Sequence, residues 1–358
     1  MQKRRPTLKD IARLTGVHVS TVSRALDPQG QKAITGEVVE RVKAAALELG
    51  YRRNRIASSL RTSRTMTVGV MIPDITNVIF PPILRGIESV LEPIGYASII
   101  VNTDNDLQRE QRLLDVLRDR GVDGILHAAV LRDDPSLAEA ALGGMPIVTL
   151  NRRSEESGIP YVINDEAAGI GAMLRHLKDL GHRRIAHLAG PQQLSTGHMR
   201  LDAFRRHAAA LGLPTDDGLI AEASRFDEQE GARCASELLD GGVDFTAILA
   251  ANDRLALGAL DALAEAGLSC PGDISVSGYN DMPFLEMIRP RLTTVRIRQF
   301  DAGAAAARML IGEIEDQPNR LSGAGFVLPV ELVLRQSTGP APAAALPKRR
   351  PAKVLGGK

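Results

Sequence analysis

The chain has 358 residues, of which 44% are hydrophobic, and its formal net charge is +1. This length predicts two or three domains, with enough apolar residues for a large core. No apolar run approaches the roughly 18 residues of a membrane span, and no apolar stretch follows the basic N-terminal residues as it would in a secretory signal. Two cysteines are too few for a disulfide scaffold. These features argue against a membrane or disulfide-rich secreted protein, and we expect a cytoplasmic one.

Charge is unevenly distributed along the chain. Residues 1–65 contain 14 Lys and Arg against 5 Asp and Glu, so this segment carries +9 and the remainder carries −8. A basic head on an acidic body indicates that only the head contacts a polyanion. The alternative is a solvated run of charges without a partner.

The first predicted elements are two short helices in residues 7–26, TLKDIARLTGVHVSTVSRAL, separated by a turn at Gly16. Thr7 followed by Asp10 is an N-cap signature. The apolar positions of the two helices are Leu8, Ile11, Ala12 and Leu14, then Val19, Val22, Ala25 and Leu26. The second helix is left with hydroxyls and Arg24 near its other face, a composition that suits base edges and phosphates in a DNA major groove. The alternative is an ordinary helical hairpin.

A third helix is predicted from a cap at Thr35 to about Leu49, with Gly50 as its stop. Three helices in about 50 residues would form a small core. Residues 51–65 are basic and polar and have few apolar positions, so they are predicted to be a linker.

From Met66 onward, nine short apolar runs between residues 67 and 297 alternate with amphipathic helical patterns. This alternation predicts an α/β fold with two lobes, each containing a parallel sheet covered on both faces. Ligands of such folds bind outside the carboxyl ends of the strands. Polar residues follow the apolar runs at Asp74, Asn77, Asn102, Asp104, Asn151, Arg152, Asn164, Asp165, Asn252, Asp253, Asn280 and Asp281. Amides and carboxylates suit a neutral polyhydroxy ligand, although each residue could instead form a turn or a helix cap.

The opening motif TLKDIARLTGV-xxx-TVSRAL resembles the signature of LacI-type transcriptional regulators. Later blocks resemble the same family in its order, including IPDITNVIFPPILRGIE, STGHMRLDAF, AILAANDRLALGAL and DISVSGYNDMPF. The resemblance implies a helix-turn-helix headpiece in residues 1–50, a hinge in 51–65 and a two-lobed periplasmic-binding-protein-like domain for effector binding and dimerisation in 66–337. Residues 338–358 are rich in Pro, Ala, Lys and Arg, and we expect them to be a disordered tail.

The resemblance also implies site residues. Those expected to contact DNA are Thr7, His18, Val19, Ser20, Thr21, Ser23, Arg24, Asn54, Arg55, Ala57 and Leu60. Leu60 stands where the family inserts a leucine into a base step from the minor groove, which kinks the duplex. Those expected to contact an effector are Ile79, Phe80, Asn151, Thr196, Arg200, Asn252 and Asn280. By resemblance Phe80 packs on a ring, Arg200 anchors an oxygen or carboxylate, and the last two asparagines hold hydroxyls.

The chain departs from the family pattern at several of these positions. His18 replaces the usual serine at the cap of the recognition helix, where histidine caps less well, and Arg53 replaces the proline that usually precedes the hinge asparagine, here Asn54. Both departures leave the operator sequence open. Ile79-Phe80 follow Asn77-Val78 where many members have Asn-Pro-Phe-Phe. Asn151 and Asn280 stand where carboxylates are usual. The pocket should therefore differ from its relatives in charge preference.

We therefore predict a homodimeric, sequence-specific repressor that binds a pseudo-palindromic operator in double-stranded DNA and is released by a sugar or sugar derivative. The alternative is a corepressor-dependent repressor, or an activator that responds to a non-sugar metabolite. No catalytic, phosphate-loop or metal-ligand pattern is present, so we expect no enzymatic activity, no cofactor and no metal. A transport receptor would need a signal peptide and would lack the basic head. A sugar-modifying enzyme would need a general base in the cleft, for which Asp253 and Asp281 are available.

Overall fold

The computed structural model describes residues 6–26, 34–51, 64–134, 137, 143–155, 158–315 and 325–343. The chain divides into two compact units between Thr65 and Met66, where the linker was predicted to end. The hinge residues Asn54, Arg55, Ala57 and Leu60 lie outside the described residues, as do residues 344–358 of the predicted tail.

The N-terminal unit contains helices α1 (Leu8–Thr15), α2 (Val19–Ala25) and α3 (Gly36–Glu48). Their buried core consists of Ile11, Val22, Ala25, Val39, Val42, Ala45 and Ala46. At the start of α1 the carboxylate of Asp10 accepts hydrogen bonds from the backbone N–H and the hydroxyl of Thr7, so the predicted N-cap is formed. Gly16 ends α1 with a left-handed φ of 68°, a conformation that costs glycine little.

Two details of the predicted headpiece core were wrong. Leu14 is 51% exposed, because it lies to one side of the face of α1 that packs inward, which is formed by Leu8, Ile11, Ala12 and Thr15. Thr35 precedes α3 as predicted, but its side chain makes no cap hydrogen bond.

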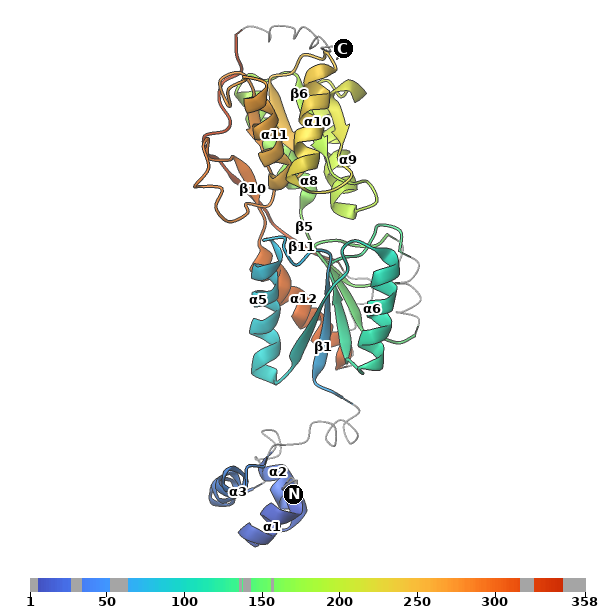
Figure 1. Ribbon diagram of the computed structural model, residues 1–358, viewed down its shortest axis with the longest axis vertical. Coiled ribbons are helices and arrows are strands. Elements are labelled where there is room, and N and C mark those ends of the chain that lie inside the picture. Colours follow the sequence, from blue (N-terminus) through green and yellow to red (C-terminus); the bar gives the residue numbers. More distant parts are fainter. Residues whose placement is uncertain are drawn as a thin grey trace, which may run out of the picture. The chain divides into compact units, whose positions relative to one another are not determined.

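The first lobe of the second unit is built on a parallel sheet. Its six described strands are ordered β11-β5-β4-β3-β1-β2, with bounds β1 Thr67–Ile72, β2 Ala97–Asn102, β3 Gly124–His127, β4 Ile147–Leu150, β5 Tyr161–Asn164 and β11 Gly325–Leu328. Successive side chains of a strand point to opposite faces. Val68, Val70 and Ile72 therefore pack toward α5 (Phe80–Leu91) and α12 (Gln299–Ile314), while Met71 packs toward α6 (Leu107–Asp119). Figure 1 shows α6 on the side of the sheet away from α5.

The second lobe repeats this architecture. Its four described strands are ordered β7-β6-β8-β9, with bounds β6 Ile185–Ala189, β7 Ile220–Glu222, β8 Ala247–Ala250 and β9 Ser275–Ser277. One face packs on α8 (Glu166–Asp179) and α9 (Ser195–Ala210), and the other packs on α10 (Glu228–Asp240) and α11 (Asp253–Glu265). The predicted α/β fold with two parallel sheets is confirmed.

The described chain passes between the lobes at three places: after β5, between β10 (Thr294–Arg296) and α12, and between β11 and β12 (Glu331–Val333). β10 and β12 pair antiparallel at this junction. Asp281 supports the junction because its carboxylate accepts hydrogen bonds of 2.7 Å from both Arg296 and Arg335. The two lobes are therefore joined by paired and ion-paired segments rather than by a single linker.

The sequence patterns missed the short strands β7, β11 and β12, which have three or four residues each and form only beside a partner that is distant in the sequence. The start of the predicted tail is ordered rather than disordered. The hydroxyl of Thr338 lies 3.0 Å from Nε2 of His176, and the carbonyl of Gly339 lies 3.0 Å from Nε2 of His182. Residues 338–341 are thereby hydrogen-bonded to the second lobe.

Candidate functional site

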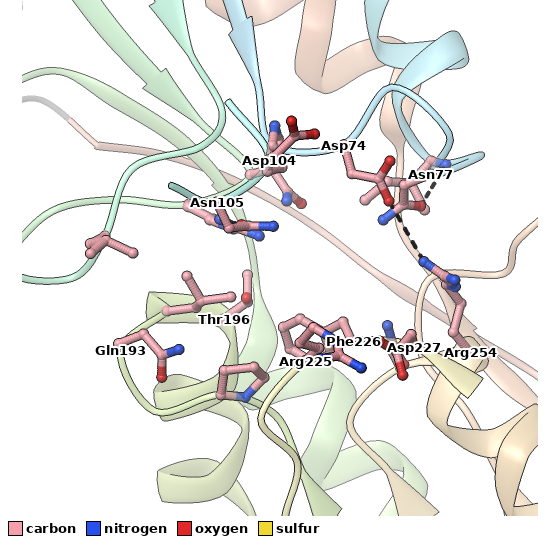
Figure 2. A pocket seen from close by; sticks show the side chains of 18 of the residues that line it. Asp74, Asn77, Asp104, Asn105, Gln193, Thr196, Arg225, Phe226, Asp227 and Arg254 are labelled. Atoms are coloured by element: carbon pink, nitrogen blue, oxygen red, sulfur yellow. Dashed lines mark hydrogen bonds and ion pairs between the residues drawn. The ribbon is translucent and has the colours of Figure 1, made fainter. Parts of the chain in front are cut away.

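A cavity of about 800 Å³ lies between the two lobes of the second unit. Figure 2 shows Asp74, Asn77, Asp104 and Asn105 on the side of the first lobe and Thr196, Phe226, Asp227 and Arg254 on the side of the second. These residues follow the carboxyl ends of β1, β2, β6, β7 and β8, where polar side chains of parallel sheets converge. The position of the cavity agrees with the rule applied to the sequence.

All seven residues expected to contact an effector line this one cavity: Ile79, Phe80, Asn151, Thr196, Arg200, Asn252 and Asn280. They come from segments separated by up to 201 positions, and both lobes contribute. Thr196 lies in the first turn of α9, which begins at Ser195.

Five polar residues of the wider predicted set do not line the cavity: Asn102, Asn164, Asp165, Asp253 and Asp281. Asp165 caps α8 by accepting a hydrogen bond from the backbone N–H of Ala168. Asn102 accepts one from the backbone N–H of Ile75. These residues therefore have the structural role in turns, caps and packing that was the alternative to ligand contact. Asn252 has both roles, since it lines the cavity and also caps α11.

Arg200 forms the most extensive polar contacts of the cavity. Its guanidinium donates to both oxygens of Glu166 at 2.7 and 3.1 Å, to the carbonyl of Ala251 at 2.7 Å and to Oδ1 of Asn280 at 3.4 Å. It also lies 3.9 Å from the centre of the Tyr279 ring. Burial alone lowers the pKa of Arg200, but the charge and hydrogen bonds of Glu166 outweigh burial and hold the pKa above its usual value.

The charge of Arg200 is thus already balanced inside the protein. A ligand that reaches this guanidinium meets a hydrogen-bond donor whose counter-ion is in place. A ligand carboxylate is therefore not required at this point, although the sequence allowed for one.

Arg254 forms a second charged contact at the rim. It donates to both oxygens of Glu228 at 2.8 and 2.7 Å, and it lies 3.8 Å from Asp74 of the opposite lobe. Two glycines allow α10 and α11 to approach closely enough for this pair. A Cβ on Gly258 would lie 2.0 Å from the carbonyl oxygen of Glu228, and one on Gly231 would lie 2.3 Å from that of Leu255.

The lobes also touch directly at the opposite rim. The backbone N–H of Arg132 donates to the carbonyl of Gln193 at 2.9 Å, and its side chain donates to that of Gln192 at 3.1 Å. The backbone N–H of Arg153 donates to the hydroxyl of Ser195 at 3.0 Å. A change in the angle between the lobes must break or remake these bonds.

Four lining residues other than glycine have positive φ: Asp104 at 55°, Asn105 at 56°, Asn151 at 63° and Asn280 at 116°. Asn and Asp enter this left-handed region more readily than other non-glycine residues, but the conformation still stores strain. Such strain persists where the surroundings enforce it, and it concentrates at functional sites.

The sequence assigned the ring-packing role to Phe80, but the structure offers a better-placed ring. Phe80 is 1% exposed and belongs to the core of the first lobe. Phe226 is only partly buried and lies among the polar side chains of the cavity. Phe226 and Asp227 were missed because they follow β7, a strand too short to detect. Arg254 was missed although it follows the predicted strand β8, because the pattern selected only Asn252 and Asp253 there. The run Ser224-Arg225-Phe226-Asp227 was the available signal, since it is polar and contains one aromatic residue.

Neither acid proposed for an enzymatic alternative is a free base in the cavity. Burial raises the pKa of Asp253 to about 7, and its oxygens accept hydrogen bonds from the Thr294 hydroxyl at 2.5 Å and the Met282 backbone at 2.9 Å. Asp281 is paired with Arg296 and Arg335. Both carboxylates hold the loop after β9 in place. In the part of the chain that the structure describes, no group of three His, Cys, Asp or Glu is placed to hold a metal ion. None of the described helices combines the length and the apolar composition of a membrane span.

In the N-terminal unit, α2 presents a polar surface. Ser20 and Arg24 are exposed, while Val19, Thr21 and Ser23 are partly buried. His18 caps the helix, because its Nδ1 accepts a hydrogen bond from the backbone N–H of Ser20 at 3.3 Å. The histidine thus caps α2 in place of the serine that is usual in the family.

Comparison with known proteins adds to this geometry. Residues 7–54 match the family model described as bacterial regulatory proteins of the lacI family, and residues 174–338 match that of a periplasmic binding protein-like domain. The ribose operon repressor of Halalkalibacterium halodurans is 30% identical over 332 residues, which cover 93% of this chain and 97% of that protein.

Two solved structures are also similar. The lac repressor dimer bound to operator and the anti-inducer ONPF has a TM-score of 0.82 and 27% identity, covering 94% of this chain and all of that one. The complex of the transcriptional regulator CelR with cellobiose has a TM-score of 0.70 and 31% identity, covering 93% of this chain and all of that one.

Proposed function

Because the chain belongs to the lacI family of bacterial regulatory proteins, we propose that it is a repressor that releases its operator when a sugar binds between its lobes. The chain is a DNA-binding transcriptional regulator. The identity of the effector and the direction of its effect form the proposal. The observation that carries the proposal is the cavity between the lobes. Seven side chains expected from the family pattern, contributed by both lobes, line it.

The cavity chemistry supports a carbohydrate. Its lining combines asparagine amides, aspartate carboxylates and arginines with a single partly buried aromatic ring, Phe226. Polar groups of this kind bind vicinal hydroxyls in pairs, and an aromatic face covers the C–H face of a sugar ring. Relatives point the same way, since one is named a ribose operon repressor and another was solved with cellobiose.

We assign DNA binding to the basic headpiece and hinge as a homodimer on a two-fold operator. The residues assigned to DNA are Thr7, His18, Val19, Ser20, Thr21, Ser23 and Arg24 in the headpiece, and Asn54, Arg55, Ala57 and Leu60 in the hinge. A protein that regulates DNA works where the DNA is, so we place it in the bacterial cytoplasm. It acts by binding and needs no catalytic turnover.

The sugar acts through the angle between the lobes. It shifts the balance only by binding one arrangement more tightly than the other. The contacts that respond are those joining the lobes at the rims, such as Arg132 with Gln192 and Arg254 with Asp74. When these rim contacts break or become strained, the first lobes of the two subunits change their relative position. The two hinges that connect them to the headpieces then meet the DNA differently.

The test measures operator affinity by fluorescence anisotropy, with an operator selected from random DNA by the full-length protein. D-ribose, maltose and cellobiose are added in turn. Phe226→Ala should bind the operator like wild type but lose the response to the active sugar. Leu60→Ala should lose operator affinity but keep the sugar-dependent rise in melting temperature. A sugar that tightens operator binding would establish corepression instead, and if no sugar changes binding or melting temperature the sugar proposal is wrong.

A further inference from the structure

The asparagines of the cavity are held in fixed orientations. Five asparagines of the described chain line the cavity, and in four of them the amide oxygen accepts a hydrogen bond from the protein. The donors are the backbone N–H of Ile79 to Asn77 at 3.2 Å, Nη1 of Arg152 to Asn105 at 3.0 Å, the backbone N–H of Leu255 to Asn252 at 2.8 Å, and Nη2 of Arg200 to Asn280 at 3.4 Å. An amide whose oxygen accepts from the protein offers its NH₂ group to whatever else it meets.

The fixed amides form a set of neutral hydrogen-bond donors on both sides of the cavity, two from each lobe. Asn280 illustrates the consequence, because a carboxylate at that position would accept from a ligand hydroxyl, whereas this amide donates. A ligand with acceptor oxygens can therefore take hydrogen bonds from the NH₂ groups of Asn77, Asn105, Asn252 and Asn280. Ring, glycosidic and hydroxyl oxygens satisfy this condition, and so would the oxygens of a phosphate or carboxylate. Electrostatics decides between them.

The charges around the cavity disfavour an anion. In the described chain four lining arginines, Arg152, Arg200, Arg225 and Arg254, are balanced by four lining aspartates, Asp74, Asp104, Asp106 and Asp227. Behind the arginines stand three more acids: Glu166 on Arg200, Glu228 on Arg254, and Glu110, whose charge acts on Arg152. Behind the aspartates one further cation, Arg109, contacts Asp104 at 2.8 Å. The cavity with these partners therefore has two more formal negative charges than positive ones.

Three of the four arginines already hold a carboxylate. Arg200 and Arg254 each make two hydrogen bonds to one carboxylate, and Arg225 donates to Asp227 at 2.7 Å. Of these three only Arg200 is buried, and a phosphate that took its guanidinium from Glu166 would leave that carboxylate buried without its counter-ion, at high cost.

We infer that the cavity selects uncharged carbohydrates, read through hydrogen bonds from the four fixed asparagine amides, and rejects the phosphorylated or carboxylated forms of the same sugars. This inference rests on the proposed function, since it assumes that the cavity holds a sugar. It adds the charge class of the effector, which makes the regulator a sensor of free sugar rather than of its phosphorylated or oxidised derivative.

The first experiment compares matched pairs of probes by isothermal titration calorimetry with the full-length protein. The pairs are D-ribose with D-ribose 5-phosphate, D-glucose with D-glucose 6-phosphate, and cellobiose with cellobionate. In each pair that binds, the neutral member should bind at least about tenfold more tightly, the factor expected when one added charge faces a site of like sign. Equal or tighter binding of an anionic member overturns the inference and leaves the proposed function standing. Binding of none of the six overturns both.

The second experiment removes negative charge without changing shape. Asp74→Asn and Asp227→Asn keep the oxygens that accept from the Thr76 and Glu230 backbones, and together they cancel the excess of two. The double variant should reduce the preference for the neutral probe by about tenfold or more. Asp217→Asn is the matched control, because it removes the same charge from an exposed side chain of the second lobe that does not line the cavity. If the double variant discriminates like the Asp217 control, charge is not the selecting feature and the inference is wrong.

Discussion

Glu166 and Arg200 form a two-pronged, buried ion pair that joins the first turn of α8 to the middle of α9 beneath the cavity, with N–O distances of 2.7 and 3.1 Å. Both side chains are at most 3% exposed. The pair fixes the plane of the guanidinium against the ring of Tyr279, and through Nη2 it fixes the amide of Asn280. One carboxylate outside the cavity therefore orients two of the groups that line it.

Glu166→Gln should destabilise the protein strongly. The change leaves the Arg200 charge buried without its counter-ion, and breaking one side of such a pair costs about 3–5 kcal/mol. Urea unfolding at neutral pH measures the loss. Glu237→Gln is the control, because that residue pairs with Arg233 while 64% exposed, and such pairs contribute no more than about 1 kcal/mol. If the two variants lose the same free energy of unfolding, the buried pair contributes no more to stability than the exposed one.

Arg24→Ala should weaken operator binding by about 5- to 150-fold, the effect of about 1–3 kcal/mol expected for an arginine that reads a base edge. Binding to unrelated DNA should change much less, because it depends on phosphates. Arg41→Ala is the control: it removes an equal charge from the exposed face of α3. The assignment of α2 to base reading fails if both variants lose specific and non-specific affinity in the same proportion.

Asn151→Gly separates binding from folding. The residue has φ of 63°, which glycine adopts without a Cβ clash, and its backbone N–H continues to donate to the Val162 carbonyl. Relief of strain and the greater freedom of the unfolded chain nearly cancel, so stability should change by less than about 1 kcal/mol. Sugar affinity should fall, because the amide is lost.

Asn151→Ala removes the same amide but retains a Cβ in the left-handed region, so it should unfold at a lower temperature than Asn151→Gly. Melting curves with and without the active sugar measure both effects. If the glycine variant keeps full sugar affinity, Asn151 does not contact the ligand.

His187 should make stability depend on pH. Burial, partly offset by a hydrogen bond to the Leu249 carbonyl, lowers its pKa to about 4 from a usual 6.5, and the ring stacks on Phe204 with 4.5 Å between centroids. Between pH 6.5 and 4 the unfolded chain binds a proton that the folded protein refuses. The free energy of unfolding therefore falls as the pH falls through this window, by up to about 3 kcal/mol.

His187→Asn keeps a donor for the Leu249 carbonyl but does not titrate. It should be less stable than wild type at pH 7, since the stacked ring is lost, and the difference between the two proteins should narrow toward pH 4. Urea unfolding at several pH values gives the comparison, in which the other titrating groups cancel. Parallel curves would show that His187 does not carry this dependence.

Local patterns were sufficient for much of this protein. The cap at Thr7, the stop at Gly16 and the alternation of short apolar strands with amphipathic helices follow from spacing alone, because helix periodicity and capping act over a few residues. The rule that ligands lie beyond the carboxyl ends of parallel strands placed Asn151, Asn252 and Asn280 near one another without coordinates. These asparagines act together because the topology brings the carboxyl ends of the strands to one edge of each sheet.

Tertiary structure alone decided the rest. β11 is predicted poorly because its four residues form a strand only when β5 is beside them, although 164 positions separate Phe326 from Val162, its partner in that strand. The orientation of each amide depends on a donor from elsewhere, as with Arg200 and Asn280, and the balance of charge in the cavity depends on Glu166, Glu228 and Glu110 standing behind the arginines. The sequence identified part of the polar lining of the cavity, including Asn151, Asn252 and Asn280. Packing determined how those groups are oriented, because a hydrogen bond formed within the protein fixes the direction in which each amide or guanidinium points.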